Sequence, residues 1–177
     1  MGFWADWQAA RARRQRVEVY LNHLLREPDA ATLQWLTACG GNAQVARREL
    51  AFARRAIGLI VAERDALDDR TAADVAHQLA PVVAAEARHD AETGRLWAER
   101  WRGYTAALAV RGHPEAPAAR LARVLFAGVG LADPAADDVR RGTAYVQDTR
   151  AVLNEQLRVA FGAASMPEDI RPSALRG

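Results

Sequence analysis

Four side chains of types that bind metals are spaced so that helical folding brings them together. Glu86 and His89 form a Glu-x-x-His step, which places a carboxylate and an imidazole on neighbouring parts of one helix surface. Asp90 follows directly. Glu49 and His89 stand equally far in sequence from a turn expected at about residue 69. If two helices fold back there in antiparallel fashion, Glu49 reaches the same height as the other three residues.

Three carboxylates and an imidazole at one height inside a helix pair suit iron, manganese or zinc. A metal site formed by Glu49, Glu86, His89 and Asp90 is therefore one hypothesis. The alternative is that arginines neutralise these carboxylates, in which case the helices are scaffold and hold no cofactor. The abundance of Arg in the chain favours this alternative.

The elements that must position these residues are two long helices forming a hairpin over residues 42–111. Gly40-Gly41 ends a preceding short helix, and Asn42 is a good N-cap for a helix over 42–67. A second helical region runs from about 71 to 111, with Pro81 either kinking it or starting a new helix. Each helix has an apolar face with carboxylates inside it, and the first also has a strip of small residues on its opposite face, Ala51, Gly58 and Ala62.

The Glu-x-x-His step resembles the half-motif of ferritin-like carboxylate proteins, and in particular of encapsulated ferritins. The resemblance covers only these few positions. It implies a site completed across a dimer of two-helix hairpins, since a complete di-metal centre uses two such steps and two further Glu residues. Residues 173–177 are loosely similar to the short tails that load cargo into encapsulin shells.

A second resemblance covers about twenty residues, from Cys39-Gly40-Gly41-Asn42 to Arg54-Arg55. It is similar to the helix-turn-helix of the Fis family and implies that Arg54 and Arg55 meet DNA at the head of a recognition helix. Nothing at Ala51-Phe52-Ala53 interrupts a continuous helix, and more than 100 residues follow the segment. Nucleic-acid binding is therefore not the preferred hypothesis.

An N-terminal helix is expected over residues 3–26, with a dense block of arginines between 11 and 16. With Trp4 and Trp7 as anchors, this helix is one candidate for contact with an anionic membrane. The basic block is short and is diluted by acidic residues. A packed helix, with a solvated Arg face and both tryptophans in the core, is therefore favoured.

In the rest of the chain, helices are expected over residues 30–39, 118–129 and 135–161. No useful strand-like alternation is present, so the fold class is all-α, with five or six helices in a bundle built around the hairpin. Residues 1–162 are expected to form one helical domain and residues 163–177 a flexible tail.

The amino-acid composition argues against several classes of function. All 24 basic residues are Arg, yet the net charge is only +2, which does not by itself indicate nucleic acid. One cysteine excludes an internal disulfide framework, and no apolar run has a membrane-spanning length, so a cytoplasmic location is expected. No phosphate-binding Gly-rich loop or nucleophile elbow is present, which favours a non-enzymatic role.

The apolar arcs of the hairpin are broader than one neighbouring helix usually covers. We therefore expect an interaction protein that acts through helix-mediated association, as a homo-oligomer or with a protein partner.

Overall fold

The computed structural model describes residues 2–66, 69–110 and 112–161, and these residues fold almost entirely as α-helix. Within them there are seven helices and no strand, which confirms the all-α class. The helices are α1 (Gly2–Leu24), α2 (Ala30–Gly40), α3 (Ala43–Asp65), α4 (Asp69–His89), α5 (Ala91–Ala109), α6 (Pro117–Gly128) and α7 (Ala136–Phe161). The predicted C-terminal tail lies outside the described residues.

The expected helical region 71–111 is divided in two, and this division gives one helix more than predicted. The chain continues as α-helix through Pro81 and breaks instead at Asp90. Asp90 has an extended backbone, with φ −142°, and its carboxylate accepts a hydrogen bond from the Glu92 amide at 3.0 Å. A short acidic side chain that caps a new helix therefore ends the old one, whereas Pro81 removes only a single backbone donor.

The capping signals before α3 act as predicted. Gly41 adopts the left-handed conformation, with φ +73°, and its amide donates to the Thr37 carbonyl to close α2. The Asn42 side chain accepts from the amides of Gln44 and Val45 at 2.9 and 3.0 Å. The chain therefore leaves α2 and enters α3 within two residues.

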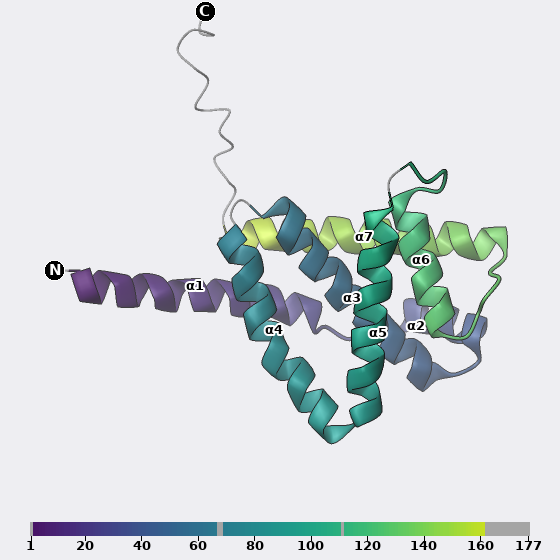
Figure 1. The fold of residues 1–177 in the computed structure, drawn as a ribbon, viewed down its shortest axis with the longest axis horizontal. Helices are drawn as coiled ribbons and strands as arrows, with labels where there is room; N and C mark the ends of the chain where they lie inside the picture. Colours follow the sequence, from purple (N-terminus) through teal and green to yellow (C-terminus); the bar gives the residue numbers. More distant parts are fainter. Residues whose placement is uncertain (1, 67–68, 111, 162–177) are drawn as a thin grey trace, which may run out of the picture.

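Helix α3 is the central element, because each of the other six helices packs against it. Most of the predicted apolar arc of α3 is buried, with Val45 and Leu59 half-buried, and Gly58 and Ala62 from the strip of small residues on its other face are buried too. The buried apolar residues of α3 are Ala46, Leu50, Phe52, Ala53, Ala56, Ile57, Gly58, Ile60, Val61 and Ala62. Burial on both faces makes α3 a core helix with neighbours all round. In Figure 1, α4 and α5 converge at one end of the molecule as a V in front of α3.

Helix α1 crosses α3 at Gly58. A Cβ added to Gly58 would stand 2.6 Å from the Leu24 Cγ, and the Tyr20 hydroxyl donates to the Gly58 carbonyl at 2.9 Å. Both Tyr20 and Leu24 are fully buried. Gly58, one of the small residues in the strip opposite the apolar arc, therefore allows a close helix contact, and the contact is with α1.

Among the described residues, no helix combines the length and the apolar character that crossing a bilayer requires.

Candidate interaction groove

Glu49 lies on α3 and is fully buried, with arginines as its partners. Its Oε2 accepts a hydrogen bond from the Arg100 Nε of α5 at 2.7 Å, and its Oε1 lies 3.7 Å from the Arg48 Nε. Burial lowers the pKa of Arg100, but the hydrogen bonds and charges of Glu49 and, to a smaller degree, Glu99 together raise it. The pair occupies the space above Gly128, where an added Cβ would stand 2.3 Å from Oε2.

Glu86 also pairs with an arginine. Both of its oxygens accept hydrogen bonds from the Arg55 guanidinium of α3, at 2.6 and 2.7 Å, which is the bidentate geometry that favours Arg over Lys. His89 is exposed at the end of α4. Asp90 caps α5, and hydrogen bonds, first from the Thr93 hydroxyl, lower its pKa.

The structure does not bring the four predicted metal ligands together. Glu49 and Glu86 are held by different arginines, and Asp90 is engaged in its cap. Throughout the described ranges, no three His, Cys, Asp or Glu side chains gather in a way that suits a metal ion. The predicted matching of heights fails between α3 and α4 themselves, because Glu86 lies against Arg55 and not against Glu49. The arrangement favours the alternative of Arg pairing, and metal binding stays an untested prediction.

The residues of the DNA-binding hypothesis lie within one continuous helix. Helix α3 runs without a turn from Ala43 to Asp65, so the segment lacks the bend of a helix-turn-helix. Arg55 is 8% exposed and holds Glu86, and the Arg54 Nε donates to the His23 carbonyl at 2.5 Å. Neither guanidinium is presented as a recognition helix would present it.

The expectation that Trp4 and Trp7 join the core was wrong. They are 72% and 43% exposed, and they contact each other edge to face with centroids 6.0 Å apart. The Arg11 guanidinium lies 5.6 Å from the centre of the Trp7 ring. Among the side chains of α1 that the structure describes, burial begins at Val17, because the N-terminal part of the helix extends past the other helices (Figure 1).

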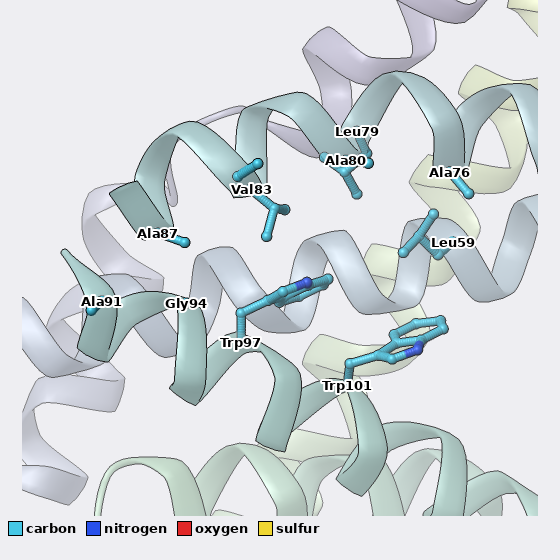
Figure 2. A pocket seen from close by; sticks show the side chains of 11 residues that line it. Leu59, Ala76, Leu79, Ala80, Val83, Ala87, Ala91, Gly94, Trp97 and Trp101 are labelled. Carbon is cyan, nitrogen blue, oxygen red and sulfur yellow. The ribbon is translucent and has the colours of Figure 1, made fainter. Parts of the chain in front are cut away.

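Between α4 and α5 lies an apolar groove of about 610 Å³ (Figure 2). Its walls contain no charged side chain; the residues lining it are Leu59, Ala76, Leu79, Ala80, Val83, Ala84, Ala87, Ala91, Gly94, Trp97 and Trp101. The indoles of Trp97 and Trp101 stack with centroids 6.2 Å apart, and Trp97 also contacts the buried ring of Phe52. Figure 2 shows both indoles on the α5 side, with Val83 projecting from α4 towards Trp97.

Ion pairs hold the two walls of the groove in place. Helix α4 is tied to α3 by Glu86–Arg55 and to α1 by an ion pair between Asp74 and Arg13. Helix α5 is tied to α3 by Arg100–Glu49. These ion pairs hold α4 against α1 and α3 and hold α5 against α3, and the groove between α4 and α5 stays open.

Near the apex of the V, a glycine brings the two walls into contact. A Cβ on Gly94 of α5 would stand 2.5 Å from the Cβ of Ala87 on α4. The groove therefore closes at this end and widens away from it. The sequence does contain a signal for this surface that the hairpin hypothesis missed: Ala76, Ala80 and Ala84 recur at a spacing of four, which predicts a stripe of small residues along one helix face.

Tyr20 and Tyr104 are both buried, and substituting each by phenylalanine tests how a buried hydroxyl affects stability. Burial raises the pKa of Tyr20 and of Tyr104, and the charge of Glu49 adds to the effect on Tyr104. The Tyr20 hydroxyl is hydrogen-bonded, whereas the Tyr104 hydroxyl has no partner among the described residues. Tyr20→Phe is expected to lower the free energy of unfolding by about 1 kcal/mol, and Tyr104→Phe to leave it unchanged or raise it.

The pH dependence of the same variants follows from the raised pKa values. Unfolded tyrosines lose their protons at about pH 10, while the folded ones keep them to higher pH. Their contribution to stability is therefore complete below about pH 10 and is lost as the pH rises towards the folded values. Urea unfolding across this range should show a smaller alkaline loss in Tyr104→Phe than in the wild type. An equal loss in both would contradict the prediction.

Comparison with known proteins gives no assignment by similarity: no family model matches the chain, and neither a curated protein nor a solved structure matches it. The geometry of the groove is therefore the basis for a functional proposal.

Proposed function

We propose that this protein acts through helix-mediated association and that the groove between α4 and α5 is the surface that receives the incoming helix. The observation that carries the proposal is the lining of the groove, which contains no charged side chain and is partly exposed. A hollow of this volume, lined by aliphatic and aromatic side chains, is typical of binding sites.

The shape of the groove suits a helix. Its α4 wall is formed mainly by alanines, and small side chains allow another helix to approach closely. Trp97 and Trp101 form the opposite wall and offer large apolar area with little loss of conformational freedom. An amphipathic helix lying in an apolar groove is a common mode of peptide recognition, with anchors at helical spacing.

Ala80→Glu tests the proposal directly. Ala80 lines the groove and is exposed, so a carboxylate there leaves the core intact but places a charge where the apolar face of a bound helix would lie. Calorimetric titration with a designed amphipathic peptide, carrying a leucine stripe flanked by glutamines, is expected to show binding that this variant weakens at least tenfold. Sedimentation velocity at micromolar concentration should show any self-association reduced by the same variant.

Ala85→Glu is the matched control. Ala85 is equally exposed on α4 but does not line the groove, so its variant carries the same charge on the same helix and should behave as the wild type. A monomeric wild-type protein that binds no amphipathic peptide would overturn the proposal. Equal weakening by both variants would assign the effect to charge alone and would overturn it too.

A further inference from the structure

The edges of the groove carry basic side chains on both walls. On α4, His77 and Arg88 directly follow the lining residues Ala76 and Ala87; on α5, Arg95 and Arg102 directly follow Gly94 and Trp101. One step along an α-helix turns the side chain by about 100°. Since α4 and α5 run in opposite directions, this step turns all four side chains away from α3, towards the mouth of the groove. All four are exposed.

Most acidic residues of the same helices are engaged elsewhere; the exception is Glu92 of α5, which is exposed and directly follows the lining residue Ala91 near the apex. Asp74 and Glu86 of α4 face α1 and α3, where Arg13 and Arg55 hold them. On α5, Glu99 contacts Arg100 at 2.8 Å and lies 3.7 Å from Arg95, and both Glu99 and Arg95 are exposed, so the second contact is weak. Basic side chains therefore outnumber acidic ones along the groove, and they stand on both of its walls.

We infer that the groove binds an acidic amphipathic helix of another protein: an apolar stripe flanked on both sides by Asp or Glu. This inference rests on the function proposed above and names the class of partner. The stripe meets Val83, Trp97 and Trp101, and the flanking carboxylates meet Arg88, Arg95 and Arg102. Guanidinium groups suit carboxylates because they form two parallel hydrogen bonds.

The N-terminal helix α1 of a second copy of this chain is a poorer occupant. The exposed apolar stripe that α1 presents, Trp4 and Trp7, is followed by the exposed cations Arg11 and Arg14. Placing this helix in the groove would set its guanidinium groups against those at the mouth. Like charges brought together across an interface disfavour the pairing.

The experiment compares two designed peptides that share one leucine stripe and differ only in its flanks, glutamate in one and lysine in the other. With the full-length protein at low salt, calorimetry is expected to give at least tenfold tighter binding for the glutamate peptide. The difference should shrink as salt is raised towards 1 M, because exposed charges are then screened.

A charge-reversed variant makes the test specific to the mouth of the groove. Arg88→Glu, Arg95→Glu and Arg102→Glu together should invert the preference, so that the lysine peptide binds more tightly. The control reverses three exposed arginines that do not line the groove, with the same change in net charge: Arg26→Glu, Arg47→Glu and Arg140→Glu. This control should keep the glutamate preference, and far-ultraviolet circular dichroism checks that both variants are folded.

The outcomes separate this inference from the proposed function. Equal binding of the two peptides, weakened by Ala80→Glu, keeps the groove as a helix-binding surface but overturns the acidic partner. Tighter binding of the lysine peptide, or of a second copy of the chain, overturns it as well. If neither these peptides nor the glutamine-flanked peptide binds, the proposed function itself fails. A glutamate preference that the charge-reversed control loses equally would assign the effect to net charge and would also overturn the inference.

Discussion

Replacing Arg100 by leucine is expected to lower the free energy of unfolding by about 3–5 kcal/mol. The reason is the position of Glu49, which is fully buried and, within the described part of the chain, accepts its side-chain hydrogen bond from Arg100. Without that guanidinium, a carboxylate remains in the core with only the more distant Arg48 beside it. Removing one partner of a buried ion pair leaves the other charge uncompensated, and that loss is much larger than the net contribution of the pair itself.

The double variant Glu49→Leu with Arg100→Leu should recover most of the lost stability. Replacing both members of a buried pair by apolar residues of similar size is often neutral or stabilising. Arg95→Leu is the control on the same helix: its side chain is 67% exposed and its ion pair with Glu99 is open to solvent, so the change should stay within about 0.5 kcal/mol.

Thermal and urea unfolding of these variants provides the measurement. The single change at Arg100 corresponds to a melting temperature lower by roughly 10 °C in a chain of this size. A double variant no more stable than Arg100→Leu would contradict the account. It would mean that the arginine stabilises the fold through its packing and not by compensating Glu49.

The second large effect is expected at Gly58, where α1 crosses α3. An alanine in a helix interior is normally favoured over glycine by about 1 kcal/mol. At Gly58, however, the new methyl would stand 2.6 Å from the Leu24 Cγ and 2.8 Å from its Cδ1. Leu24 is 1% exposed and has no room to turn away. We expect overpacking to outweigh the helix propensity, with a net loss of about 1–2 kcal/mol for Gly58→Ala and more for Gly58→Val.

Gly103→Ala is the matched control for this change. It makes the same substitution inside α5, where the added carbon would stand 3.2 Å from a terminal methyl of the partly buried Val124. The neighbour has to give way by only a few tenths of an ångström, so the gain in helix propensity should offset the contact. Urea unfolding compares the two. Equal stability of Gly58→Ala and Gly103→Ala would show that the α1–α3 crossing tolerates an extra methyl group.

Much of the fold is determined locally and could be predicted. Asn42 and Gly41 set the junction of α2 and α3 through short-range hydrogen bonds, and the apolar periodicity of α3 identified its buried face. The break at Asp90 was missed because two local signals compete there. Proline is in general the stronger helix breaker. The helix ends at Asp90 instead, because the Asp90 carboxylate caps the next helix by accepting hydrogen bonds from the Glu92 amide and the Thr93 hydroxyl.

The candidate site was only partly accessible from sequence. Periodicity placed Glu49 and Glu86 inside apolar faces, and that placement is right for Glu49, which is buried, and for Glu86, which faces α3. Which arginine pairs with each carboxylate depends on the angles at which α4 and α5 pack, and the spacing of residues along the chain does not give those angles. The exposure of Trp4 and Trp7 was missed for the same reason, because it depends on where the other helices end beside α1.

The sequence by itself determined the helical class, the junction between α2 and α3 and the presence of carboxylates within the apolar faces of α3 and α4. These follow from backbone hydrogen bonding and from side-chain periodicity, which act over a few residues. Only the tertiary structure decided that those carboxylates pair with arginines and that an apolar groove opens between α4 and α5. Both depend on contacts between residues about 30 to 50 positions apart, such as Arg55 with Glu86 and Glu49 with Arg100, which form only when whole helices have packed.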